Sequence, residues 1–147
     1  MAEGDPTHAD LLAIHSRLGV IEGKVNLVAR AERDALRALL EAVVRAHPET
    51  GQIYLLLDGV RTRQDIHKLM NEHGIAISDI TVWRRIKDME TEHGIVRLVG
   101  GAGNAMVYNP DPETEKLLNL SAKIREWLKD EGEVVPEKAK RPRKKKS

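Results

Sequence analysis

The sequence contains no cysteine and no phenylalanine, and its only aromatic side chains are two tryptophans and two tyrosines. The absence of cysteine excludes disulfide bonds and thiolate metal ligands, and it agrees with a reducing compartment. No apolar run approaches the ~18 residues of a membrane-spanning helix, and no stretch has the pattern of a secretion signal. We therefore expect a soluble, cytoplasmic protein with an aliphatic core and no membrane partner.

The formal net charge of +1 conceals an uneven distribution of charge. Residues 137–147 hold seven basic side chains and one acidic one, whereas the other 136 residues hold 17 basic and 22 acidic ones. Residues 133–147 also lack hydrophobic periodicity, which predicts a disordered basic tail. Such a tail suits contact with the phosphates of a polyanion, and the alternative is a solubilising end. Its basic residues are Lys138, Lys140, Arg141, Arg143, Lys144, Lys145 and Lys146.

Residues 1–46 are expected to form a long helical segment that associates with a second copy of the chain. Apolar residues recur there in alternating steps of three and four, which is the heptad pattern of a coiled coil. Gly19 and Gly23 each cost about 1 kcal/mol relative to Ala, so the isolated helix would be marginal. A homodimer is favoured, and the alternative is a helix packed on its own domain. The heptad positions are Leu11, Ile14, Leu18, Ile21, Val25 and Val28.

The remaining chain predicts a mainly α fold with one small β-hairpin. Helices are expected from residue 48 to about 57, from 63 to 72 after a Thr62 cap, and from 78 to 93. The β-branched residues 95–99 and the returning residues 105–108 flank a glycine-rich turn, which predicts a hairpin. A single C-terminal helix is expected over 111–132. The domains are thus 1–46, 47–110, 111–132 and the tail 133–147.

Three stretches carry a resemblance to a known family: LDGVRTRQDI at 57–66, ITVWRRIKDME at 80–90 and EHGIV at 92–96. In their order along the chain they resemble winged helix-turn-helix proteins of the bacterial and archaeal transcription-regulator type. The resemblance implies that the helix 78–93 lies in the major groove of DNA. It also implies that the hairpin 95–108 is a wing that touches a phosphate or the minor groove. The outer helices and the tail are not covered by it.

The residues of the third helix fit this role on physical grounds. A helix that enters the major groove, ~12 Å wide, buries one stripe and presents the other to the bases. Val82, Ile86 and Met89 form the apolar stripe, and Arg84 is the first candidate for guanine, because Arg donates two hydrogen bonds to that base. The candidate DNA-binding residues outside the tail are Ser78, Asp79, Thr81, Trp83, Arg84, Arg85, Lys87, Arg97 and Asn104.

Two other functions remain open at this stage. Residues 62–108 hold six basic and six acidic side chains, which is not the basic stripe of a committed DNA binder. In the first alternative, the chain is a non-enzymatic adaptor or scaffold, with Trp83 in a contact between subunits. In the second, it is an architectural DNA protein without an operator. We expect double-stranded DNA as partner and a nucleoid-associated location, with dimerisation placing two recognition helices on one face of the duplex.

Catalysis and metal binding find little support in the sequence. The six histidines show no ligand spacing together with carboxylates on one helical face, and a metal site needs three or four convergent ligands. The segment Gly100–Gly103 lacks the lysine and the helix start of a phosphate-binding loop, so a hairpin turn explains it better. No nucleophile–base pair is identifiable. We therefore expect no enzyme activity, no cofactor, no metal and no small-molecule ligand.

Overall fold

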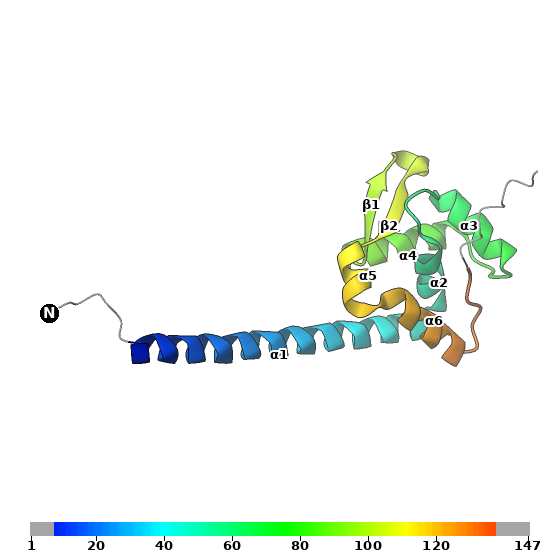
Figure 1. Ribbon diagram of the computed structural model, residues 1–147. Coiled ribbons are helices and arrows are strands. Elements are labelled where there is room, and N and C mark those ends of the chain that lie inside the picture. Colours follow the sequence, from blue (N-terminus) through cyan, green and yellow to red (C-terminus); the bar gives the residue numbers. More distant parts are fainter. Residues whose placement is uncertain (1–7, 138–147) are drawn as a thin grey trace, which may run out of the picture. The chain divides into compact units, whose positions relative to one another are not determined.

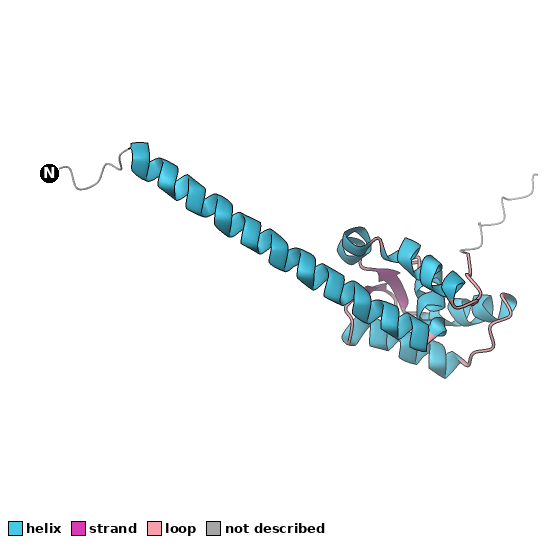
Figure 2. Ribbon diagram, turned by 90° about the horizontal axis from the view of Figure 1, so that it is seen from below, coloured by secondary structure: helices cyan, strands magenta, loops and turns pink. Residues whose placement is uncertain are grey.

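The structure, a computed structural model, describes the backbone of residues 8–137 and the side chains of residues 27–137 except Asn104. The fold is mainly helical with one two-stranded antiparallel hairpin, which confirms the predicted class (Figures 1 and 2). Contacts divide the chain into two units, residues 1–36 and 37–147. The elements in order are α1 (His8–Ala46), α2 (Pro48–Leu56), α3 (Arg63–Glu72), α4 (Asp79–Thr91), β1 (Val96–Gly100), η1 (Gly103–Ala105), β2 (Val107–Pro110), α5 (Pro112–Leu118) and α6 (Leu120–Asp130).

The first unit is occupied, within the described residues, by α1 alone. Its last described side chains are exposed, including Leu27 at 64 % and Val28 at 56 %. Val28 is the one predicted heptad residue whose side chain the structure describes. The other five, from Leu11 to Val25, lie outside the described side chains. Leu27 and Val28 are thus an exposed apolar pair in the described part of this unit.

Helix α2 is the centre of the second unit. Every residue from Thr50 to Leu57 is buried, so the helix has no solvent face. It packs against α4 and α6 and against the last turns of α1 (Figure 1). Gly51 makes this approach possible, since a Cβ there would lie 2.9 Å from Cγ2 of Ile124 and 3.0 Å from Cγ1 of Val44. A helix that is apolar all round is thus explained by burial on every side.

Helices α3 and α4 begin and end at residues that the sequence marks. Thr62 and Asp65 form a reciprocal capping box at the start of α3, and Ser78 accepts a hydrogen bond from the backbone N–H of Thr81 at the start of α4. Gly74 follows α3 with φ of +78°. The predicted stripe of α4 is confirmed, because Val82, Ile86 and Met89 are all buried. These local signals are enough to predict where α3 and α4 begin and end, because a cap acts within four residues.

The hairpin lies slightly later in the sequence than predicted, and its strands have the predicted lengths of five and four residues. Strand β1 is shifted by one residue, to Val96–Gly100, and the returning strand begins at 107 rather than 105 because residues 103–105 form a 3-10 turn. Gly101 has φ of +79°, and a Cβ there would lie 2.0 Å from the carbonyl oxygen of Ala105. The second strand also bridges Thr62 through Val107, and the turn η1 lies against α3. The hairpin is therefore anchored beside the start of α3.

The single C-terminal helix predicted over 111–132 is wrong, because Asn119 divides it. Asn119 adopts a left-handed conformation, with φ of 50° and ψ of 47°, which Asn tolerates better than most residues. Both carboxylate oxygens of Glu115 accept the backbone N–H of Ser121, and the Ser121 hydroxyl also donates to Glu115. The break allows Leu118 and Leu120 to be buried together. Glu115 also faces Tyr54, whose hydroxyl pKa is raised by burial and by that carboxylate.

Residues 133–137, which we call the strap, do not follow the predicted disorder. Gln52, a buried polar residue of α2, donates from Nε2 to the carbonyl oxygen of Val134 over 2.9 Å. Pro136 is buried as well. The predicted disorder is therefore wrong for residues 133–137, and residues 138–147 lie outside the described part of the chain.

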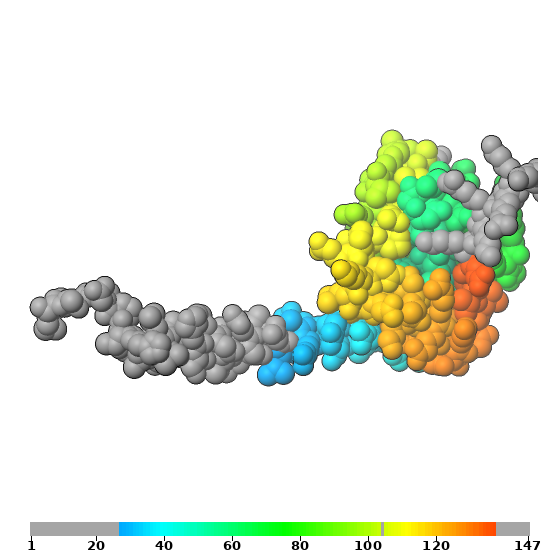
Figure 3. Space-filling model, in the orientation of Figure 1, coloured from blue at the N-terminus to red at the C-terminus, as the bar shows by residue number. Residues whose placement is uncertain are grey.

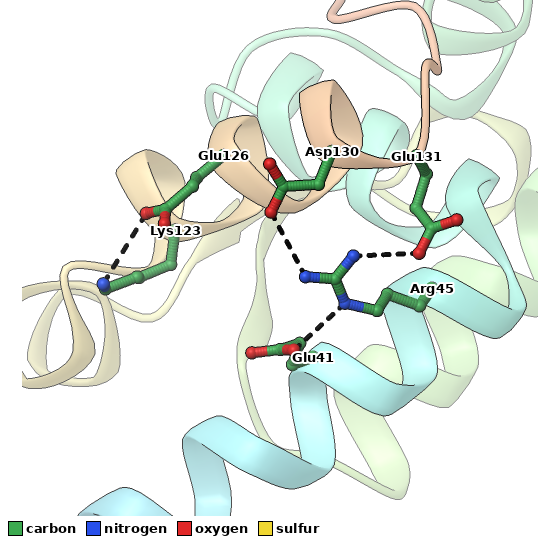
Figure 4. Close-up of polar contacts among 6 residues, drawn as sticks. All are labelled: Glu41, Arg45, Lys123, Glu126, Asp130 and Glu131. Atoms are coloured by element: carbon green, nitrogen blue, oxygen red, sulfur yellow. Dashed lines mark hydrogen bonds and ion pairs between the residues drawn. The ribbon is translucent and has the colours of Figure 1, made fainter.

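The last turns of α1 belong to the second unit and are held there by Arg45. Its guanidinium contacts Glu41 at 3.0 Å, Glu131 at 2.8 Å and Asp130 at 3.3 Å (Figure 4). The hydrogen bonds to Glu131 and Glu41 raise the pKa of Arg45 above its usual value. Arg45 thus links the end of α1 to the end of α6.

Candidate nucleic-acid interface

Helix α4 presents an exposed face opposite its buried stripe. At 100° per residue, Ile80 and Arg84 lie on the side away from Ile86 and Met89. Ile80 is 64 % exposed, Trp83 is 38 % exposed, and Arg84 is exposed. Ser78 is exposed at the start of the helix, and Thr81 is half-buried. The outward face therefore combines the exposed Arg84 with apolar surface, and the partly exposed Lys87 and Asp88 border it.

Arg85 is not available outward, contrary to the sequence-based prediction. Its Nε lies 3.0 Å from Oε1 of Glu49, and its Nη1 lies 3.6 Å from Oδ2 of Asp88. The side chain is 24 % exposed and rests between α4 and the start of α2. Arg85 thus helps to hold α4 on the domain, and its charge is already balanced.

Lys87 and Asp79 are engaged within the domain in the same way. The Nζ of Lys87 lies 3.1 Å from Oε1 of Glu90, and this hydrogen bond, together with nearby Tyr108, raises the pKa of Lys87. Asp79, predicted to accept from cytosine or to repel phosphate, lies 3.2 Å from Arg63 of α3. Among the described residues, Arg84 is then the cation of α4 that has no acidic partner. The sequence of α4 alone does not show which of its three basic side chains is balanced by an acidic one, and these ion pairs do.

The hairpin carries little charge. Arg97 is exposed on β1 between buried Val96 and exposed Leu98, and Val99 is exposed as well. The charge of Arg97 contributes to the lowered pKa of Asp111, although hydrogen bonds from the hydroxyl and the backbone N–H of Thr114 contribute more. The side chain of Asn104 lies outside the described residues, as do the seven basic residues of the tail.

Two features of the domain, one on this face and one in the core, could not be predicted in full from the sequence. Ile80 follows the cap by two residues, and only its angular position on the helix, opposite Met89, marks it as outward. Gln52 stands within an apolar run, where a buried amide needs a hydrogen-bond partner. That signal indicates a partner without identifying Val134, which lies 82 residues away in the sequence.

A solvent-open groove of about 600 Å³ lies beside the N-terminal end of α4. It separates the strap from the turn between α3 and α4, and it is lined by Pro48, Gly74, Ser78, Thr81, Glu133 and Val134 among others. No group of three or more His, Cys, Asp or Glu side chains in the described part of the chain is placed to hold a metal ion. No described helix is long and apolar enough to cross a membrane.

The chain was compared with protein families, with curated proteins and with solved structures. None of the three comparisons finds a match.

Proposed function

We propose that this chain binds double-stranded DNA as a transcriptional regulator, with residues 47–110 acting as a winged helix-turn-helix domain. In this assignment α3 and α4 form the helix-turn-helix, α4 enters the major groove, and the hairpin is the wing. The observation that carries the proposal is the division of α4 into a buried aliphatic stripe and an exposed face with the unpaired Arg84. A recognition helix needs both sides at once.

The chemistry of the exposed face suits base recognition better than general attraction to phosphate. Arg84 can donate two hydrogen bonds to O6 and N7 of guanine. Ile80 lies one turn before it and offers an apolar contact for the methyl group of thymine. Arg97 of the hairpin is placed on a separate element and can meet a neighbouring phosphate. The zero net charge of residues 62–108 then matters less, because the acidic groups of α4 are paired.

Dimerisation through α1 completes the proposal. The heptad positions of residues 11–28 would form the seam between two copies, and exposed Val28 belongs to that seam. Two domains on one duplex would then read half-sites about one helical turn or a multiple of it apart.

A second function is favoured by one observation, the exposed apolar surface on both α4 and the hairpin. Ile80, Trp83, Leu98 and Val99 are each at least 38 % exposed. Protein contacts use such side chains, and aromatic residues are enriched among them. In this alternative the domain is an adaptor that docks a protein through the same face, and the tail alone binds nucleic acid.

A matched pair of substitutions tests the proposal. Duplexes are first selected from a random pool with the full chain, and binding of Arg84→Ala and Arg125→Ala to the selected duplex is then measured. Arg125 is an exposed arginine of α6 for which the described residues provide no acidic partner, so both variants lose one unpaired positive charge. We expect Arg84→Ala to lose roughly 5- to 150-fold in affinity, corresponding to about 1–3 kcal/mol, and to relax preference at one base pair.

The control variant should bind like the parent chain. If the pool yields no preferred sequence, or if the two variants weaken binding equally, α4 does not read bases. The adaptor is then the better supported of the two functions. If the full chain binds no duplex even at low salt, DNA binding itself is wrong.

A further inference from the structure

The last turns of α1, residues 37–46, have two sides that differ in what covers them. Leu40 and Val44 are buried, and together with residues of α2 and α6 they line a small space inside the domain. Arg45 adds its ion pairs with the end of α6. This side of the helix is therefore occupied by contacts within the chain.

The opposite side, which we call the α1 face, is open and apolar. It consists of the four exposed residues of this segment, none of which is polar: Ala38, Leu39, Ala42 and Ala46. Leu39 is 52 % exposed. Ala42 and Ala46 lie about 160° round the helix from Val44, so they point away from the domain. These turns, cyan in the space-filling view, form part of the lower border of the second unit (Figure 3). A helix that meets only solvent on one side carries polar residues there, so this composition indicates a contact surface.

The sequence identifies the partner that fits this surface. The heptad of residues 11–28 continues in the same alternating steps of three and four through these positions: Glu32, Ala35, Leu39, Ala42 and Ala46. All five are exposed, whereas the buried Leu40 and Val44 lie outside the heptad seam. The repeat in the sequence and the exposure in the fold thus select the same residues independently. A heptad seam is complementary to the same seam of an identical chain.

We infer that the α1 face binds the α1 face of a second copy in a parallel coil. The inference rests on the proposed function in one respect, since a parallel coil places both domains at the same end, as two half-sites on one duplex require. The alanines allow the two helix axes to approach closely, and Leu39 fills the seam between them. The end of α1 then packs on its own domain with one side and on the second copy with the other.

The coil would reach the domain without an interposed linker. Ala46 ends α1, and only His47 separates it from Pro48 at the start of α2. A flexible linker lets two domains settle on half-sites at several spacings, whereas a coil that ends on the domain holds them at one. We therefore expect duplexes selected from a random pool to share a single half-site spacing. Several spacings of equal affinity would contradict the inference.

The absence of cysteine allows the contact to be tested by cross-linking the full chain. Ala42→Cys places a thiol on the α1 face, and Arg30→Cys places one on an exposed position of α1 outside the seam. Equal seam positions are neighbours in a parallel coil, as disulfide formation requires. Under mild oxidation we therefore expect Ala42→Cys to form linked pairs roughly tenfold or more faster than Arg30→Cys. Equal rates would overturn the parallel contact.

Glu32 supplies a second test of the same arrangement. It is the one charged residue among the continued seam positions, and in a parallel coil the two Glu32 carboxylates are neighbours that repel each other. An equimolar mixture of the parent chain and Glu32→Lys should therefore contain more mixed dimers than chance pairing gives. Chance pairing in this mixture would show that the two copies are not parallel and in register.

A third variant tests Leu39 itself. Because Leu39 is exposed, Leu39→Asp should leave the urea unfolding of the domain unchanged, while the mass measured by sedimentation falls to that of one chain. Arg30→Asp, outside the seam, is the matched control and should keep the mass of the parent chain.

The outcomes separate this inference from the proposed function. If the parent chain is a dimer and Leu39→Asp is one too, the α1 face belongs to a different partner, and the inference fails while base reading by Arg84 is untouched. If the parent chain sediments as one chain both alone and on the selected duplex, the inference fails together with the proposed dimer. Loss of duplex selection with the dimer intact would instead remove the proposed function and leave the α1 face as a contact between two copies.

Discussion

Gly51 offers the sharpest test of how the second unit is packed. It lies inside α2, where Ala is better than Gly by about 1 kcal/mol on helix propensity alone. The added Cβ would meet Cγ2 of Ile124 at 2.9 Å and Cγ1 of Val44 at 3.0 Å, both closer than ordinary contact. Overpacking of a core by one methyl group costs about 1–3 kcal/mol. We therefore expect Gly51→Ala to destabilise the domain by up to about 2 kcal/mol, against the propensity of the helix.

The assay is urea unfolding followed by fluorescence and by circular dichroism. Trp127 is only 3 % exposed on α6, so its emission reports the loss of the α2–α6 contact. The control is Ala42→Gly on an exposed position of α1, which should cost about 1 kcal/mol from propensity without any change of packing inside the domain. Parallel slopes of free energy against urea would show that the variants unfold over the same surface.

The double variant Gly51→Ala with Val44→Ala decides the mechanism. Removing the Val44 methyls relieves two of the three close contacts of the new Cβ and leaves the one with Ile124, so the two changes should not add. We expect the double variant to be more stable than the sum of the single effects by about 1 kcal/mol or more, which is the coupling typical of residues in contact. Strict additivity, or a Gly51→Ala variant more stable than the parent, would refute the close approach of α1, α2 and α6.

Three further predictions concern other parts of the chain. Thr62→Ala removes one half of the capping box of α3 and should lower the free energy of unfolding by about 0.5–2 kcal/mol in urea. Asp111 has a lowered pKa in the folded chain, so its contribution to the free energy of unfolding is present above the usual carboxyl pKa of about 3.8 and is lost as the pH falls through the folded pKa. The variant Asp111→Asn lacks this carboxylate and should therefore lose less stability than the parent chain between pH 5 and pH 2. Ile21→Asp, at a heptad position, should reduce the mass measured by sedimentation to that of one chain, whereas Asn26→Asp, at an outer position, should leave it unchanged.

The elements that sequence reasoning predicted well are those with local signals. Thr62, Ser78 and Gly74 set the ends of α3 and α4 through hydrogen bonds or backbone angles that span at most four residues. The buried stripe of α4 follows from helical periodicity in the same way. The break at Asn119 has no such signal. The pattern of residues 117–128 continues through it, and the break is stable because Leu118 and Leu120 both find space in a core made by distant elements.

The surface of α4 was harder to predict because charge pairing is a tertiary property. Arg84 and Arg85 are adjacent in the sequence and identical in type, and periodicity places both away from the centre of the stripe. Arg85 is paired because Glu49, which is 36 residues away, begins α2 at the flank of α4 where Arg85 lies. Arg84 points 100° away from Arg85 round the helix, and among the described residues the nearby Asp88, one turn further on, is paired with Arg85 instead.

The difference between the paired Arg85 and the unpaired Arg84 bears on the choice between the two proposed functions. A protein-docking face gains little from an isolated arginine whose neighbours are neutralised internally, because an unpaired cation must be desolvated when apolar surfaces close around it. A base-reading face gains from the same arrangement, since a single guanidinium without competing carboxylates is free to hydrogen-bond a guanine edge. In the proposed function Ile80 and Trp83, which lie on the same side of Arg84, would supply apolar contacts for thymine methyl groups beside that hydrogen bond. The internal pairing of Asp79, Arg85 and Lys87 therefore leaves Arg84 as the residue of this face on which the proposed base contact is tested.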